Sequence, residues 1–229
     1  MLKRFADEIW IADGGNVGVA GFQYPTRMAV IRMSSGGLFI WSPTRLTDAL
    51  RADVNALGHV RHIVAPNSLH HLFITEWASA FSQAKLHAPP SLRAKREDIA
   101  FTADITDQPS AEWAADIDQV LMRGNLITTE VVFFHRKSGT ALFTDLLQQI
   151  PSDLLAGWRA TMAKLDLMTG AEPQVPRKFR LAFTNRRAAR AALTRVLEWP
   201  TRKVLMAHGT PIESGGQDYL RRAFAWLAR

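Results

Sequence analysis

The sequence predicts one α/β domain (α+β in some classification schemes) with mixed sheets, spanning residues 1–229. The first observation is composition: 229 residues, 47% apolar and 21% charged, are enough to bury one large core. The second is an alternation of short strands and helices through the first ninety residues. The third is a β-hairpin signal in the middle of the chain, without a repeat or linker that would divide it.

The first half of the chain predicts a partly parallel sheet. A helix is expected over residues 46–57, where apolar side chains recur at helical spacing and Gly58 follows as a stop signal. A strand over 60–65, a helix over 74–81 and a strand over 85–88 come next, and this alternation implies crossover connections. Three earlier β-like runs lie at residues 8–12, 28–33 and 38–41, the first followed by a turn at Asp13-Gly14-Gly15.

The second half adds a hairpin and more helices. Two apolar runs, 118–122 and 129–134, flank Arg123-Gly124-Asn125, which is typical of a hairpin turn. Asn185 is a plausible cap for a helix over 185–198. The other expected elements are strands at 140–144 and 203–207 and helices at 152–168 and 219–227.

Composition restricts the chemistry and the cellular location. The chain has no cysteine, so any metal ion must be held by nitrogen and oxygen ligands. Absence of cysteine also fits a reducing cytoplasm, which is the expected location. The first residues contain acids too early for a signal peptide, and no apolar run reaches the roughly 18 residues of a membrane span.

Positive charge is concentrated in the second half. The net charge is +7, yet residues 1–115 hold 11 basic and 11 acidic side chains. The stretch from Arg177 to Lys203 carries most of the excess, and Arg186, Arg187 and Arg190 are candidate contacts for an anionic small-molecule substrate. A solvated helix face is the alternative. Nucleic acid is not expected as a partner, because no aromatic residues interleave with the cations of the helix over 185–198.

Metal-competent side chains follow several predicted strands or lie where a strand leads into a helix. His70 and His71 come after a strand and a loop, His135 and Asp145 end two consecutive strands, and His208 ends the last strand. In sheets with crossovers such positions converge on one edge. Imidazoles with a carboxylate suit Zn²⁺, iron or Mn²⁺. We therefore predict a metal site from these five residues.

Each of the five also has a purely structural interpretation. His135 is placed where a core histidine could simply be hydrogen bonded, and the His70-His71 pair could cap a helix. Asp145 could cap the turn that follows it, and His208 could lie in a turn by chance. The joint pattern favours the metal site, because the residues come from separate strand ends.

The order of these residues resembles the metallo-β-lactamase superfamily. In that superfamily an HxHxDH motif follows a strand, a later strand ends in histidine, the next leads to a bridging aspartate, and a last strand ends in histidine. The segments 65–73 and 133–135 resemble an uncharacterised branch of this fold, described as a domain of unknown function. The resemblance implies a four-layer αββα sandwich and runs from about Ile9 to the C-terminus.

Departures from the HxHxDH motif imply one metal ion in place of two. If His71 matches the last histidine of the motif, Pro66 and Ser68 replace its two earlier histidines and His70 replaces its aspartate. Proline cannot ligate, and serine is a poor ligand at neutral pH. Loss of the motif's aspartate also removes the carboxylate that the superfamily uses to orient or deprotonate water, so two-metal hydrolysis is not expected.

Two functional hypotheses follow. The first is a hydrolase with one divalent ion, zinc being favoured over iron or manganese, that acts on an ester, thioester, lactone or phosphoester. Asp145 is its candidate catalytic residue, as a proton acceptor or a ligand. The second is a non-catalytic metal-binding or interaction domain with a closed ligand shell. The sequence leaves the substrate and the oligomeric state open.

Overall fold

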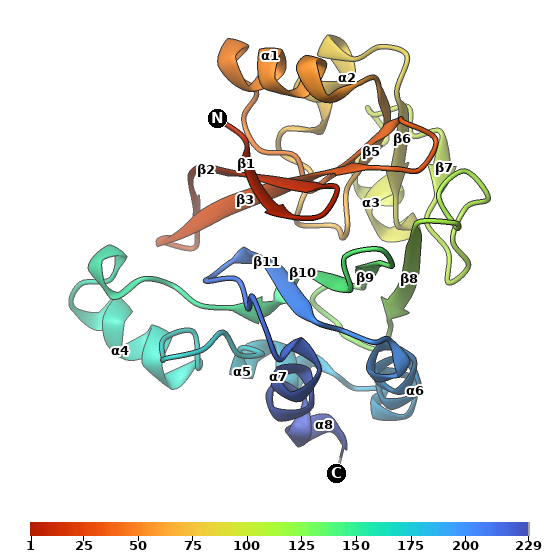
Figure 1. Ribbon diagram of the computed structural model, residues 1–229. Helices are drawn as coiled ribbons and strands as arrows, with labels where there is room; N and C mark the ends of the chain where they lie inside the picture. Colours follow the sequence, from red (N-terminus) through yellow and green to blue (C-terminus); the bar gives the residue numbers. More distant parts are fainter. Residues whose placement is uncertain (229) are drawn as a thin grey trace.

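Two sheets face each other in the computed structural model, which describes residues 1–228 (Figure 1). The first sheet has seven strands in the order β1-β2-β3-β4-β5-β6-β7, and the second has four in the order β11-β10-β9-β8. The strands of the first sheet are β1 (Lys3–Ala6), β2 (Ile9–Val19), β3 (Phe22–Arg32), β4 (Leu38–Trp41), β5 (Val60–Val64), β6 (Lys85–Ala88) and β7 (Ala103–Asp104). Those of the second are β8 (Ile117–Met122), β9 (Glu130–His135), β10 (Thr140–Gln148) and β11 (Lys203–His208).

Helices cover the outer face of each sheet, which completes four layers (Figure 1). Against the first sheet lie α1 (Asp48–Leu57), α2 (Ile74–Ala80) and α3 (Pro90–Lys95). The helices of the second half are α4 (Trp158–Leu165), α5 (Arg177–Ala182), α6 (Arg186–Glu198), α7 (Gly216–Ala223) and α8 (Ala225–Ala228). Separate apolar clusters lie between each sheet and its helices and between the two sheets. The expected αββα sandwich with mixed sheets is confirmed.

Parallel pairing brings several strand ends to one edge of the molecule. In the first sheet β4, β5 and β6 are parallel neighbours, and in the second β10 is parallel to β11. Arg27 of β3 joins the sheets at this edge, because its guanidinium donates to the carbonyls of Met206 (3.0 Å) and Gly209 (2.5 Å). The loops after β4, β5 and β11 and the last part of β10 therefore meet there.

Two expectations about local structure were wrong. The turn predicted at Asp13-Gly14-Gly15 is a bulge inside β2, which continues to Val19 before the chain reverses at Ala20-Gly21. Gly14 provides close packing at this point, since a Cβ there would lie 2.3 Å from Thr26 Oγ1. The helix predicted over 152–168 is a 3-10 turn, Ser152–Leu154, followed by α4. Gly157 separates them with a φ of 57°, outside the helical region.

Other elements agree with the sequence pattern to within a few residues. Asn185 caps α6 as expected, by accepting a hydrogen bond from the amide of Ala188 (3.0 Å). The last expected helix is divided into α7 and α8. Among residues 1–228, no helix combines the length and the apolar character needed to cross a membrane.

Candidate metal centre

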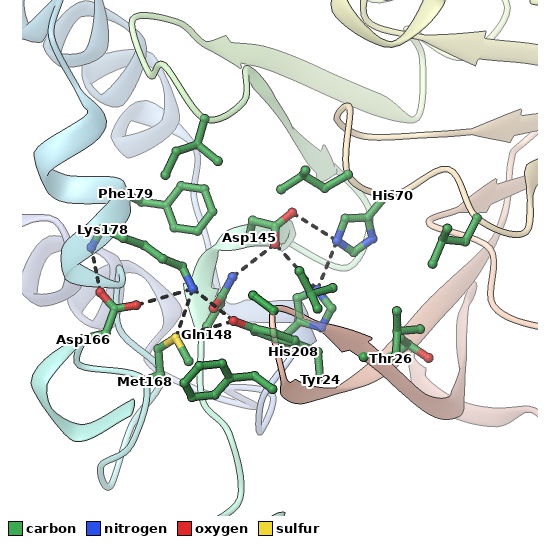
Figure 2. A pocket seen from close by; sticks show the side chains of 18 of the residues that line it. Tyr24, Thr26, His70, Asp145, Gln148, Asp166, Met168, Lys178, Phe179 and His208 are labelled. Atoms are coloured by element: carbon green, nitrogen blue, oxygen red, sulfur yellow. Dashed lines mark hydrogen bonds and ion pairs between the residues drawn. The ribbon is translucent and has the colours of Figure 1, made fainter. Parts of the chain in front are cut away.

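Three of the predicted ligands meet at the edge where the strand ends converge. His70 lies in the loop between β5 and α2, Asp145 lies in the last part of β10, and His208 is the last residue of β11. Because β10 and β11 run parallel, with Gln148 opposite His208, Asp145 and His208 are brought to the same edge. All three side chains point toward one another (Figure 2).

The three side chains present a compact set of donor atoms. His70 Nε2 is 3.1 Å from His208 Nε2 and 3.2 Å from Asp145 Oδ2, and His208 Nε2 is 3.8 Å from Asp145 Oδ1. Two donors that each lie about 2.1 Å from a tetrahedral ion are roughly 3.4 Å apart. The observed spacing is close to this value. Two imidazoles and one carboxylate therefore fit a divalent ion such as Zn²⁺.

Hydrogen bonds fix the orientation of both imidazole rings. His208 Nδ1 donates to the carbonyl oxygen of Pro25 (2.7 Å), so its proton is on Nδ1 and its Nε2 lone pair faces the cluster. Burial, and then the neighbouring His70, lower the pKa of His208 to about 4, which keeps the ring neutral and able to ligate. His70 Nδ1 lies 2.8 Å from Ser42 Oγ, which leaves its Nε2 for the cluster.

Ser42 holds His70 from a strained position. It follows β4 directly and adopts a φ of 51°, in the left-handed region that a residue with a Cβ rarely occupies. Such strain persists where the surroundings impose it, often at functional sites. Partners of this kind set the orientation and basicity of metal-binding imidazoles.

Asp145 stays ionised at the centre of the cluster. Burial alone raises the pKa of its carboxyl, but the neighbouring His70 and His208 and the Asn67 amide reverse this effect and hold the pKa well below its usual range. Asn67 Nδ2 donates to Asp145 Oδ2 (2.7 Å), and Gln148 Nε2 donates to Oδ1 (3.1 Å). An ionised carboxylate held from both sides is suited to ligate a cation.

Glu130 is a fully buried carboxylate that anchors the backbone of Asp145. Its two oxygens accept the amide hydrogens of Thr144 (2.7 Å), Asp145 (2.7 Å) and Leu146 (2.9 Å). Burial first, and then the charge of Asp145, raise the pKa of Glu130 to about 7. The residue begins β9, at the same edge as Asp145, because β9 and β10 are antiparallel.

This pairing of β9 and β10 places His135 away from the cluster, so its assignment as a ligand has no geometric support. His135 pairs with Thr140 at the start of β10. It is thus five residues, or about 17 Å along the strand, from Asp145. Its Nδ1 lies 2.8 Å from Ser138 Oγ in the turn between the strands. Consecutive antiparallel strands end at opposite edges, so His135 and Asp145 cannot both lie at the edge of the cluster.

His71 lies beside the cluster without joining it. Arg96 Nη1 donates to His71 Nδ1 (2.8 Å), and the half-buried ring has a lowered pKa because of burial and then the charges of Lys95 and Arg96. The group of donor atoms that could share one ion contains His70, Asp145 and His208. His71 lines the adjoining pocket. Its assignment as a ligand therefore has no geometric support.

The basic segment is divided between two places. Arg186 and Arg187 are exposed at the start of α6, and Arg190 donates to the carbonyl of Leu227 (2.8 Å). None of these three lines the pocket beside the cluster, whereas Arg177 and Lys178 do. The proposed contact with an anion at residues 186–190 thus stays a prediction, and α5 supplies the cations near the site.

Sequence reasoning missed four residues that position the ligands: Ser42, Asn67, Glu130 and Gln148. Glu130 carries the one charge in the apolar run 129–134, and a buried carboxylate needs donors around it. That signal was visible. Ser42 and Asn67 lie in loops that follow strands, where polar residues are common, and nothing in the sequence indicates the role of Gln148.

A pocket of about 880 Å³ opens directly over the cluster. Figure 2 shows Tyr24, Met168, Lys178 and Phe179 around it, with His70, Asp145 and His208 on one side. Lys178 Nζ lies 3.0 Å from Tyr24 Oη and 3.4 Å from Asp166 Oδ2. The cluster is therefore reached through a cavity of a size typical for small-molecule sites.

A second histidine pair, His62 and His87, lies away from this pocket. His62 Nδ1 and His87 Nε2 are 3.1 Å apart, and Trp113 contacts both rings edge-on. Burial lowers the pKa of each to about 4, and the partner His62 contributes further at His87. Lys85 and Glu112 form an ion pair nearby.

We expect this pair to make stability depend on pH. Each folded pKa lies below the ordinary value of 6.5, so the pair stabilises the fold above pH 6.5 and this contribution is lost as pH falls toward 4. The variant His62→Asn/His87→Gln keeps polar atoms near the two nitrogens without the titration. Because each lowered pKa corresponds to about 3 kcal/mol, the variant should lose several kcal/mol less than the wild type between pH 7 and 4 in urea unfolding. Parallel curves for the two proteins would refute this assignment.

Comparison with solved structures identifies the fold class. A metallo-β-lactamase from Pontibacter korlensis superposes with a TM-score of 0.64 at 14% identity, over 99% of this chain and 98% of that one. A metallo-β-lactamase from Erythrobacter litoralis with β-mercaptoethanol in its active site gives 0.65 at 12% identity, over 99% and 95%. No curated protein matches the sequence. The chain thus has the metallo-β-lactamase fold.

The family is defined by sequence. Residues 6–175 match the family described as a domain of unknown function, DUF4336. The match spans well over half of the chain, so the protein belongs to this family. Its fold is the metallo-β-lactamase fold that the resemblance in the motifs implied.

Proposed function

We propose that the protein is a hydrolase that uses one divalent metal ion, zinc in the first instance. The observation that carries this proposal is the number and placement of the donors: three side chains converge beside an open pocket. Catalytic zinc sites have three protein ligands and keep a position for water or substrate, whereas structural sites are closed by four. His70, Asp145 and His208 would hold the ion, which supplies Lewis acidity and lowers the pKa of water toward about 7.

Side chains around the cluster have separate roles in this proposal. Asp145 acts as a ligand, because a carboxyl whose pKa is held this low is a weak proton acceptor near neutral pH. Ser42 and the Pro25 carbonyl fix the imidazoles in their ligating orientation. Arg177 lines the pocket and provides a positive charge for an anionic group of the substrate, since Lys178 is paired with Asp166. Esters, thioesters, lactones and phosphoesters are the substrate classes consistent with these groups.

A panel of 4-nitrophenyl acetate, butyrate and phosphate, a thioester and a lactone tests this proposal. We expect turnover of at least one compound, loss of turnover on treatment with a chelator, and recovery when zinc is restored. His208→Ala should remove the activity, whereas His135→Gln, which alters a histidine outside the cluster, should retain it. Metal bound without turnover of any class would favour the alternative, a non-catalytic metal-binding domain.

A further inference from the structure

The exposed apolar side chains of this protein are gathered around one cavity. Among residues 1–228, seven of the ten large apolar side chains that are exposed line the pocket over the metal centre. Leu181 is 73% exposed and Leu165 54% exposed. Soluble proteins scatter such side chains singly, and a contiguous group marks a binding surface.

These side chains come from five separate parts of the chain. Val19 lies at the tip of the β2–β3 hairpin, Leu165 ends α4, and Leu72 belongs to the loop before α2. The hairpin and α4 are joined by an edge-on contact between Phe22 and Trp158 and by a hydrogen bond from Arg159 Nε to the Gly21 carbonyl (2.7 Å). These contacts hold together part of the apolar wall of the pocket. The wall consists of Val19, Leu69, Leu72, Ile127, Met162, Leu165 and Leu181.

The apolar wall and the metal centre line the same pocket. The same cavity of about 880 Å³ is lined by Leu165 and Leu181 and by His70, Asp145 and His208. Pockets for small molecules occupy roughly 300–1,000 Å³ and are mostly apolar. An occupant that touches both the apolar wall and the three donors must enter the cavity, which a flat macromolecular surface does not do.

The charged side chains of the pocket also restrict the kind of molecule that it can bind. The pocket also contains Lys95, Arg177 and Lys178, and outside the metal centre its one acidic side chain is Asp166, which pairs with Lys178. Lys95 and Arg177 thus leave a positive balance. A hydrocarbon chain with an anionic group matches both the apolar wall and this charge.

We infer that the substrate is an amphipathic anion with a linear hydrocarbon chain, bound with the chain along the apolar wall and the anionic group near Arg177. This inference rests on the proposed function for the scissile group. Binding of the chain itself does not require the metal ion. The two can therefore fail separately.

The inference is tested by measuring the binding of decan-1-ol and decanoate by calorimetry, before and after treatment with a chelator. Decan-1-ol should bind about tenfold more tightly than octan-1-ol, since each buried methylene gives about threefold to fourfold. Leu165→Ser/Leu181→Ser should weaken decan-1-ol binding at least tenfold. Leu126→Ser, a substitution at a side chain that is 77% exposed and outside the pocket, is the matched control and should leave it unchanged.

The charge is tested by a second pair of variants. Arg177→Gln should weaken decanoate severalfold, more so at low salt, and leave decan-1-ol unaffected. Arg187→Gln, from the same basic segment but outside the pocket, should change neither.

Several results would overturn the inference. These are equal affinities for the two alcohols, equal loss in Leu126→Ser and in the double variant, or decanoate binding that Arg177→Gln leaves intact. Sedimentation with phosphatidylglycerol vesicles without saturable decan-1-ol binding would assign the wall to a lipid surface instead. A dimer that the double variant dissociates would assign it to a second copy. Intact chain binding without turnover of 4-nitrophenyl decanoate or of any other compound in the panel would contradict the proposed hydrolase and leave this inference standing.

Discussion

Replacing Glu130 by alanine should lower the free energy of unfolding by about 3 kcal/mol or more. Its carboxylate accepts the amide hydrogens of Thr144, Asp145 and Leu146 in a region without exposed surface. Alanine would leave these three donors without a protein partner, and each unsatisfied buried group typically costs about 1–3 kcal/mol. Urea unfolding at pH 7.5, with the slope checked against the wild type, gives the value.

Glu130→Gln is the matched control for the loss of volume. Glutamine keeps one acceptor oxygen, but its NH2 group faces backbone donors in place of the second oxygen. The expected loss of stability is therefore smaller than in Glu130→Ala. Both variants should also weaken metal binding, because the backbone of Asp145 would no longer be held. A loss below about 1 kcal/mol in Glu130→Ala would mean that the three amides find other partners, and the anchoring role would be wrong.

Two substitutions at the site should lower metal affinity to different extents. Ser42→Gly removes the hydroxyl beside His70 and should weaken binding about 10–100-fold, as loss of such partners does. Glycine also relieves the positive φ of residue 42, so stability should not fall with affinity. His208→Ala removes a ligand and should weaken binding further. Competition against a chromophoric chelator measures both.

Histidines outside the cluster provide the controls for this series. His71→Gln and His135→Gln should bind the ion within a fewfold of the wild type, because neither ring contributes to the converging donors. A loss in His135→Gln as large as that in His208→Ala would contradict the hairpin register. Unchanged metal affinity in Ser42→Gly would show that the hydroxyl does not support metal binding.

Much of the fold could be predicted because its signals are local. The runs 60–65 and 203–207 and the cap at Asn185 are each set by a few neighbouring residues, and the structure confirms them. The turn predicted at Gly14 and Gly15 was wrong because glycine is required at position 14 by a tertiary contact. Thr26 and Thr44 occupy the space that a Cβ at Gly14 would fill. Nothing within ten residues of Gly14 carries that information.

The site was predicted in part for the same reason. His70, Asp145 and His208 were found because parallel strands and their loops share an edge. His135 lies away from these donors because the β9–β10 hairpin reverses the chain at residues 136–139. The groups that hold the ligands, such as Ser42, depend on contacts between strands far apart in sequence.

Metal analysis of protein purified without added metal tests the central claim most directly. We predict close to one divalent ion per chain in the wild type and in His135→Gln, since three converging donors form one site. His70→Ala and His208→Ala should each fall below about 0.2 ion per chain. A wild-type content below that level, or contents unchanged in both alanine variants, would contradict the assignment of this cluster as a metal centre.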